Sequence, residues 1–180
     1  MSEAWEFVEV TVEALTLSEM GFVLLLRGED SGRAMPIFIG APEAHSIALA
    51  LQEETFPRPL THDLFRATLE ELGASVTRVQ IIHLQEQTFH ARMVLEAAGN
   101  EFELDARPSD AIAMALRFEA PIYVREDIWD TASVPCEIDG EVAADPRGQL
   151  QKRLEQALEA EHYEDAARLR DELRRLDGGN

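Results

Sequence analysis

Two Arg-Pro junctions place the strongest constraint on how this chain can fold. The stretch LDARPSDAIAMALR, residues 104–117, ends a strand-like pattern at Arg-Pro and continues at once as an alanine-rich helix. RPLTHDL, residues 58–64, has the same order of Arg-Pro, a hydroxyl residue, an acid and an apolar helical run. The pattern predicts two abrupt helix starts, with Thr61 and Ser109 as N-caps and Pro108 holding the entry rigid.

Apolar periodicity predicts strands in two groups, each followed by helices. The first group is residues 6–17, 21–28 and 33–40, joined by turns short enough for antiparallel pairing. A helix from residue 41, with Pro at its first positions, and another over 62–72 follow. The second group is 75–84, 88–97 and 101–105, followed by the helix of the opening stretch and a last short strand at 121–124. Grouped strands favour α+β over a repeated βαβ pattern. We therefore predict a domain over residues 1–134, with a mixed, largely antiparallel sheet and about three packed helices.

The sequence pattern of the C-terminal part predicts a linker followed by a helical hairpin. Residues 135–149 are rich in turn formers and lack periodicity, which predicts a linker. Leucines recur at helical spacing after residue 150 and again after 166, with a break near Glu161-His162. Each predicted helix of this hairpin, residues 150–177, has only about three turns and is too short to be stable alone. Its apolar stripes must pack against each other or against a partner.

The acidic balance argues against a general polyanion-binding surface. The net charge is −19. Residues 1–145 hold 27 acids and nine arginines, hence −18. Nucleic-acid binders usually show the reverse, unless bound cations or a local arginine cluster intervene. Adaptation to a salty cytosol is an alternative explanation that the composition leaves open.

Cysteine usage and hydropathy favour a cytoplasmic location. Cys136 is the single cysteine, so no internal disulfide can form. No apolar run approaches the ~20 residues of a membrane helix, and the acidic first residues lack the basic start of a secretory signal. We expect a cytoplasmic protein that does not bind membranes.

The polar residues of the helix starts have a structural and a functional interpretation. Structurally, they are caps and ion pairs, such as Arg107 with Asp105 or with Asp110. Functionally, carboxylates can hold Mg²⁺ or Mn²⁺, and guanidinium groups can bind a phosphate. The candidate metal ligands are Glu43, Asp63, Asp105 and Asp110. The candidate substrate-binding residues are Arg58, Thr61, Arg107 and Ser109.

The candidate catalytic residues follow from the needs of phosphodiester hydrolysis. The reaction requires an activated water, and positive charge for the developing transition state. His62 is a general base or a metal ligand, with Asp63 as its orienting partner or a second ligand. The full catalytic set is His62, Asp63, Asp105, Arg107 and Asp110. No zinc-ligand spacing, glycine-rich phosphate loop or serine nucleophile elbow accompanies them.

Three stretches closely resemble the bifunctional nuclease family: MPIFIGAPEAHSIALAL, RPLTHDLF and LDARPSDAIAMALRFEAPIYV. The resemblance covers roughly residues 8–128. It implies a compact α+β domain and a nuclease that acts on both RNA and DNA.

LEQALEAEHYEDAARLRDELRRL, residues 154–176, looks like a UVR motif. That motif is a helical hairpin of excision-repair proteins and of regulators of Clp-type proteases, where it mediates protein–protein contact. The resemblance implies a protein partner, with Tyr163, Ala166, Ala167, Leu169 and Arg170 as the contact residues. We predict a nuclease that the hairpin recruits to its partner, and we expect a homo-oligomer. The alternative is a non-catalytic oligomeric adaptor that acts through the hairpin.

Overall fold

The computed structural model describes residues 5–18, 20–29, 32–135, 146–160 and 162–177, and these form eight strands and six helices. In chain order they are β1 (Phe7–Ser18), β2 (Gly21–Gly28), β3 (Arg33–Ile39), α1 (Ala41–Leu51), α2 (Thr61–Glu71), β4 (Ala74–Gln85), β5 (Thr88–Ala97), β6 (Asn100–Ala106), α3 (Pro108–Phe118), β7 (Ile122–Arg125), α4 (Glu126–Ala132), β8 (Val134–Pro135), α5 (Pro146–Glu159) and α6 (Tyr163–Asp177). The predicted α+β class is confirmed.

One mixed sheet contains all eight strands, in the order β6-β5-β4-β7-β1-β2-β3-β8. Each predicted group of three strands forms an antiparallel meander. The short strand β7 joins the two meanders, because it pairs antiparallel with β1 and parallel with β4. β4–β7 is the one parallel pair in the described part of the sheet, so the prediction of a largely antiparallel sheet is also confirmed.

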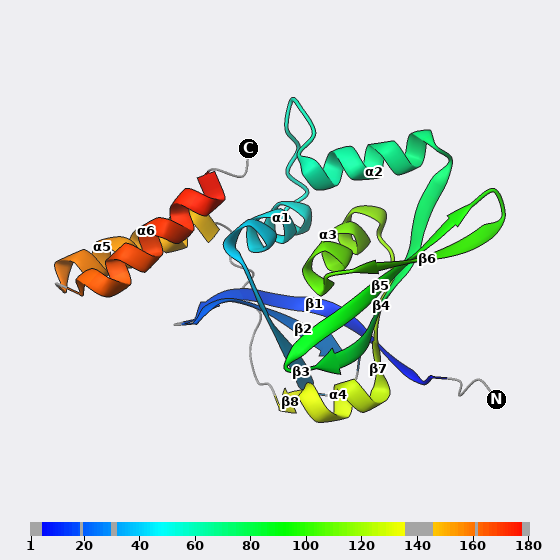
Figure 1. The fold of residues 1–180 in the computed structure, drawn as a ribbon, viewed down its shortest axis with the longest axis horizontal. Helices are drawn as coiled ribbons and strands as arrows, with labels where there is room; N and C mark the ends of the chain where they lie inside the picture. Colours follow the sequence, from blue (N-terminus) through cyan, green and yellow to red (C-terminus); the bar gives the residue numbers. More distant parts are fainter. Residues whose placement is uncertain (1–4, 19, 30–31, 136–145, 161, 178–180) are drawn as a thin grey trace.

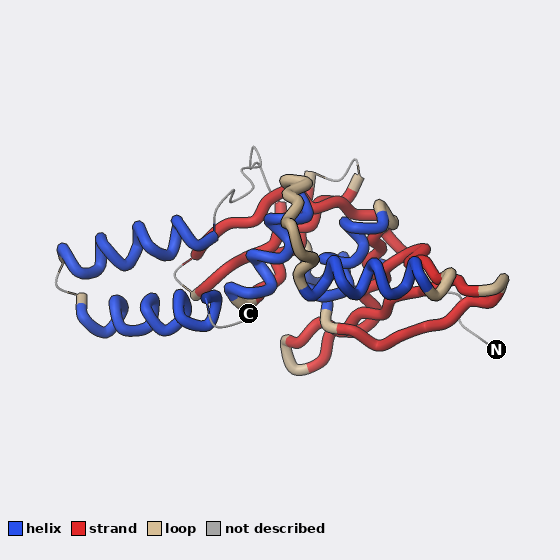
Figure 2. Tube along the Cα trace, turned by 90° about the horizontal axis from the view of Figure 1, so that it is seen from above, coloured by secondary structure: helices blue, strands red, loops and turns tan. Residues whose placement is uncertain are grey.

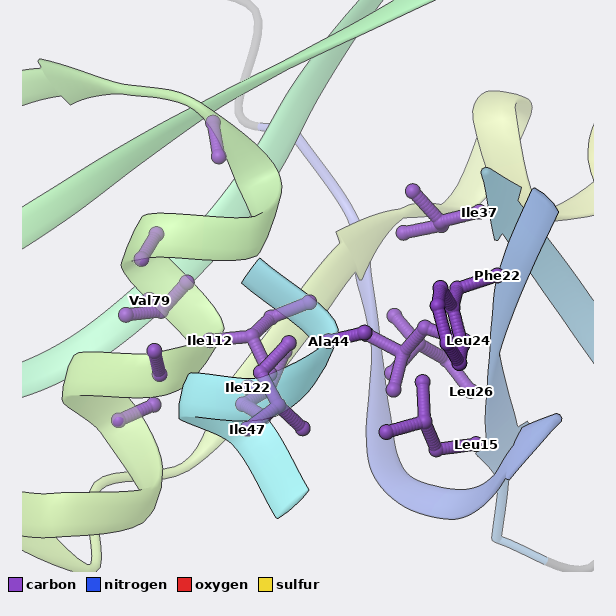
Figure 3. Close-up of a cluster of buried hydrophobic side chains, with 14 of the residues drawn as sticks. Leu15, Phe22, Leu24, Leu26, Ile37, Ala44, Ile47, Val79, Ile112 and Ile122 are labelled. Carbon is purple, nitrogen blue, oxygen red and sulfur yellow. The ribbon is translucent and has the colours of Figure 1, made fainter. Parts of the chain in front are cut away.

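Helices α1, α2 and α3 lie together on one side of the sheet, and α4 lies on the opposite side in the view of Figure 1. α1 packs against α3 and β2, and α3 also packs against α2, β4 and β5. The core forms where strand side chains meet the apolar faces of α1 and α3 (Figure 3). Its labelled members are Leu15, Phe22, Leu24, Leu26, Ile37, Ala44, Ile47, Val79, Ile112 and Ile122.

The helix starts differ from the predicted caps. Leu60 is the N-cap of α2 and Arg107 is the N-cap of α3, and neither side chain makes a capping hydrogen bond. The first helical hydrogen bonds run from Leu64 N–H to the Leu60 carbonyl and from Ala111 N–H to the Arg107 carbonyl. The prediction of Thr61 and Ser109 as N-caps was therefore wrong. In α3 the reason is Pro108, whose fixed φ suits the first helical position and moves the cap back by one residue.

Two short elements after β7 were not predicted. α4 has seven residues and buries Ile128 and Trp129, with Glu126 and Asp127 in its first turn, where carboxylates suit the positive helix end. β8 pairs with the end of β3, so the strand at 121–124 is not the last one.

The predicted helical hairpin is confirmed, and it lies against the domain. α5 and α6 pack side by side and project away from the sheet (Figures 1 and 2). α5 begins at Pro146, four residues before the predicted start. Most of the predicted linker, residues 136–145, lies outside the described residues. None of the described helices is both long and apolar enough to cross a membrane.

Candidate functional site

The guanidinium of Arg107 holds together two carboxylates from different helices. Its Nε donates to Oδ2 of Asp110 at 2.7 Å, and its Nη1 donates to Oε1 of Glu43 at 2.9 Å. Asp110 and Glu43 belong to the first turns of α3 and α1, so two helix starts meet at one cation. The Arg107 side chain is 67% exposed, whereas that of Glu43 is 18% exposed. The arginine therefore covers the two acids on their solvent side.

His62 extends this cluster to the third helix start. Its Nε2 lies 3.4 Å from Oδ1 of Asp110, and its Nδ1 lies 2.8 Å from Oγ of Ser46 on α1. Both ring nitrogens of His62 thus have a partner, and the imidazole is only 20% exposed. We call Glu43, Ser46, His62, Arg107 and Asp110 the helix-start cluster.

Asp63, the neighbour of His62, belongs to a separate ion pair. Its Oδ1 accepts a hydrogen bond from Nε of Arg117 at 2.6 Å, and its Oδ2 accepts from the Leu60 N–H at 3.1 Å. The Arg117 side chain is only 7% exposed, and its Nη1 also donates to the carbonyls of Ala113 and Ser46. Asp63 therefore ties the start of α2 to α3.

The pKa directions follow from these contacts. The hydrogen bond with His62 makes the largest contribution to lowering the pKa of Asp110; burial opposes it, and the Arg107 guanidinium adds to the lowering. Burial would raise the pKa of Asp63, but the hydrogen bond and charge of Arg117 outweigh burial and hold that pKa below its usual value. Both carboxylates are therefore ionised at neutral pH.

Asp105 does not join the helix-start cluster. It lies directly opposite Arg92 in the β5–β6 register, while the next residue, Ala106, lies opposite the fully buried Ala91. Directly opposite residues share a face, and successive residues alternate. Asp105 therefore lies on the face of the sheet away from the core helices, where the Arg92 guanidinium lies over the ring of Trp5.

The remaining predicted substrate-binding residues have different surroundings. Arg58 and Thr61 are exposed, at the loop before α2 and in its first turn. Within the described residues, Arg58 makes no ion pair with the cluster. Ser109 is buried in the first turn of α3 and is only 8% exposed, so it is not accessible to a substrate in this structure.

The carboxylates of Glu43 and Asp110 could hold a divalent ion if Arg107 moved away from them. Mg²⁺ is commonly held by one or two protein carboxylates together with substrate phosphates. Glu43 and Asp110 supply two, but the guanidinium of Arg107 now binds both. No group of three or more His, Cys, Asp and Glu side chains suited to a metal is present among the described residues. A metal bound here would require Arg107 to leave the two carboxylates.

Chemically, the cluster combines a titratable imidazole with an exposed guanidinium. An imidazole oriented by a hydroxyl and a carboxylate is a common proton-transfer device. A guanidinium presents a two-pronged donor surface that matches a phosphate. The two groups share Asp110, which contacts His62 through one oxygen and Arg107 through the other.

Comparison with known proteins identifies the family. Residues 24–137 match the bifunctional nuclease domain, and this range contains the whole helix-start cluster. The chain belongs to the bifunctional nuclease domain family. Residues 148–178 match the UvrB/uvrC motif, in agreement with the predicted order of the two parts.

Relatives of this chain include a mycobacterial protein and bifunctional nucleases of plants. An uncharacterized protein of Mycobacterium tuberculosis is 41% identical over 140 residues, which cover 77% of this chain and 84% of that protein. Bifunctional nuclease 1 of Oryza sativa subsp. indica is 32% identical over 109 residues, covering 58% of this chain and 33% of the plant protein. Bifunctional nuclease 1 of Arabidopsis thaliana is 25% identical over 177 residues, covering 83% of this chain and 54% of the relative.

The predicted partner residues of the UVR motif are divided between surface and interior. Tyr163 is 67% exposed, and Arg170 is also exposed. Ala166 and Leu169 are buried within the chain, and Ala167 is half-buried. Ala166 and Leu169 therefore pack inside this protein, whereas Tyr163 and Arg170 lie on its surface.

Sequence reasoning missed Ser46 and Arg117. Ser46 follows Glu43 by three residues and Arg117 follows Asp110 by seven, spacings that place each pair on one face of its helix. That periodicity was the available signal. Both residues sit in alanine-rich helices, whose composition favours an interpretation as packing surface.

Proposed function

We propose that this protein hydrolyses phosphodiester bonds of DNA or RNA at the helix-start cluster. Family membership supports the reaction class, and both plant relatives described above carry the name bifunctional nuclease. The observation that carries the assignment to this place is the array of Arg107, Asp110 and His62. The Asp110 carboxylate contacts both other residues: one oxygen contacts His62, the proposed proton-transfer group, and the other accepts from Arg107, the proposed phosphate-binding group.

In this proposal Arg107 leaves both Glu43 and Asp110 and binds the phosphate of the substrate. Its side chain is exposed enough to turn without disturbing the core. In this step Nδ1–H of His62 donates to Oγ of Ser46, and Nε2, once released from Asp110, takes the proton of the attacking water. The leaving oxygen takes a proton from solvent, and the imidazolium returns its own proton to solvent. Proton transfer of this kind contributes about 10²- to 10⁴-fold to a rate.

A divalent cation is part of the proposal. Glu43 and Asp110 would hold Mg²⁺ or Mn²⁺ once Arg107 has turned to the phosphate. The ion would neutralise the two carboxylates, which otherwise repel a polyanionic substrate. Local neutralisation matters here because the domain carries a large negative charge.

The test is cleavage of labelled single-stranded DNA and RNA by purified protein, with Mg²⁺, with Mn²⁺ and with a chelator. Heat-treated protein and the variant His62→Ala are the controls. We expect metal-dependent cleavage that the variant loses. If wild-type protein cleaves no better than the heat-treated sample, the nuclease proposal fails and the adaptor interpretation replaces it.

We also propose that the hairpin binds a protein partner through its exposed end. Leu158 near the end of α5 is 51% exposed and Tyr163 at the start of α6 is 67% exposed, so the turn of the hairpin presents one apolar and one aromatic side chain to solvent. A cytoplasmic location belongs to the same proposal, supported by the single cysteine. Capture of a partner by wild-type protein but not by Tyr163→Ala is the expected result.

Self-association is the third part of the proposal. Leu64, Phe65 and Leu72 on or next to α2, and Phe102 and Leu104 on β6, are all exposed. β6 is also an edge of the sheet, and an edge strand offers unpaired backbone groups to another chain. These features support a homo-oligomer that buries α2 or β6.

A further inference from the structure

The base of the helical hairpin shares its core with the nuclease domain. Leu150, near the start of α5, is fully buried, and Leu169 and Leu173 on α6 are buried as well. All three belong to the same continuous apolar cluster as the side chains of α1 and the sheet. The hairpin stripe is therefore covered by this chain itself.

A polar anchor fixes the same end of the hairpin. Arg153 of α5 donates from Nη1 to the Ser18 carbonyl at 2.7 Å and from Nη2 to the Leu17 carbonyl at 3.1 Å. Both carbonyls lie at the end of β1, so α5 is bonded to the β1–β2–β3 meander of the sheet. Apolar burial and directed hydrogen bonds thus act at one interface.

The helix on which the hairpin rests is the one that carries part of the cluster. α1 packs against α5 and α6 as well as against α3, and Figure 1 shows it between the hairpin and α3. Glu43 and Ser46 lie one turn apart on α1 and face α2 and α3 through their bonds to Arg107 and His62. Ala41 and Ala48 lie on another face of the same helix and are buried.

We propose that the hairpin base is a buttress that sets the position of α1, and through it Glu43 and Ser46. α1 has eleven residues and is too short to hold its place without tertiary packing. A partner protein that binds the hairpin through its buried stripe has to separate it from α1, and so lowers cleavage. A partner that binds only the exposed end leaves the cluster intact. The effect on cleavage rests on the proposed nuclease function, whereas the coupling between hairpin and α1 does not.

Hydrogen exchange measured on the full chain tests the coupling without any activity. Leu173→Asp places a charge in the buried base, and Leu158→Asp is the matched control, since the same substitution falls on an exposed leucine of the hairpin. We expect amide exchange in residues 41–51 to accelerate at least tenfold in Leu173→Asp, with strands β4 and β5 unchanged. Leu158→Asp should leave exchange in α1 at the wild-type rate.

Arg153→Gln provides a second, milder variant that removes the anchor without adding a buried charge. It should accelerate exchange in residues 41–51 severalfold, and it decides the matter if Leu173→Asp does not fold. Wild-type exchange in α1 while the hairpin itself exchanges fast would overturn the proposal and make the hairpin an independent appendage. If the coupling is found in a protein that cleaves nothing, the buttress stands and the nuclease function fails.

Discussion

The imidazole of His62 lies 3.4 Å from the carboxylate of Asp110, and this contact joins the start of α2 to the start of α3. The two residues are 48 positions apart in the chain. A distance at the long end of the hydrogen-bond range is common where a catalytic contact tightens only around a substrate. We therefore expect the pair to function as a unit.

Replacing His62 should abolish most of the activity with little change in folding. His62→Ala is expected to lower kcat by about 10²- to 10⁴-fold, the usual contribution of general acid–base catalysis. Asp110→Asn should lower kcat too, and the double variant should lose less than the product of the two single losses. Cleavage assays and circular dichroism on the three proteins test this. Independent, multiplying effects would show that the pair does not act as one unit.

A variant of Ser46 distinguishes between two mechanisms, in which its hydroxyl either positions His62 or attacks the phosphate. If its hydroxyl only holds Nδ1 of His62, the Ser46→Ala variant should still cleave measurably and its pH–rate profile should be displaced. Its kcat should be about 10-fold lower, which corresponds to the loss of one hydrogen bond of ~1.4 kcal/mol. If the hydroxyl is the nucleophile, the variant falls to the background rate. We expect the first result. Background-level cleavage by folded Ser46→Ala would assign the attacking oxygen to Ser46.

The Asp63–Arg117 pair should matter for stability more than for chemistry. Asp63→Asn leaves a nearly buried guanidinium without its carboxylate, and should cost about 1–3 kcal/mol in the free energy of unfolding. The cost stays at the low end because Asp63 is partly exposed and Arg117 keeps two carbonyl acceptors. Asp105→Asn is the matched control, since Asp105 is exposed on the other face of the sheet, and we expect its stability and its cleavage to be unchanged.

The same pair predicts a pH dependence. The pKa of Asp63 is lower in the folded protein than its ordinary value of 3.8. The stabilisation from its ionised form is therefore complete above that value and is lost as the pH falls from 3.8 through the lowered pKa. Urea denaturation at several pH values should show the gap between wild type and Asp63→Asn narrowing below pH 3.8. A gap that is constant down to the acid transition would mean that the charge of Asp63 contributes nothing.

In the proposed mechanism, Arg107 binds the phosphate of the substrate through its two-pronged guanidinium. Arg107→Lys keeps the positive charge but loses the two-pronged donor, so we expect KM to rise more than tenfold while the melting temperature changes little. Arg66→Lys is a suitable control, because Arg66 is another surface arginine, 47% exposed, and pairs with a carboxylate, Glu70 on α2. Equal KM values for the two variants would remove Arg107 from the phosphate site.

Association through the exposed apolar side chains can be measured directly. Phe102→Glu should lower the fraction of oligomer in sedimentation analysis if β6 is the interface, and Leu64→Glu should do so if α2 is. Met20→Glu is the control, since Met20 is 76% exposed at the β1–β2 turn. A wild-type chain that sediments as a monomer at all concentrations would refute the expected homo-oligomer.

The strand groups were predictable because alternating stretches such as β1 and short apolar runs such as β2 are bounded by turn residues. β8 and α4 were not, because two residues and seven residues are too few to show a period. The caps were misassigned for a related reason. A hydroxyl next to Arg-Pro suggests a cap, but the carbonyl that accepts the first hydrogen bond of α3, from the Ala111 N–H, belongs to Arg107.

The residue types at the site could be predicted from the sequence, but which of these residues contact each other could not. Asp105 and Asp110 lie in one short stretch of sequence, yet β6 turns the first away from the helices and α3 turns the second toward His62. Only the strand register distinguishes them. The bond between Ser46 and His62 depends on how α1 and α2 both pack against α3, which no local pattern records.

The place of β7 in the sheet has a consequence for the chain during its synthesis. Phe7 and Arg125 are register partners, so more than a hundred residues must be added before β1 gains its second neighbour. At about 5–20 residues per second this takes on the order of ten seconds on a ribosome. Until then the nascent chain carries two meanders, each with an open inner edge that another nascent chain can pair with. The step that closes these edges is therefore the arrival of four residues, Ile122–Arg125, and a pause in translation just before them would prolong the period in which the newborn protein is most prone to aggregate.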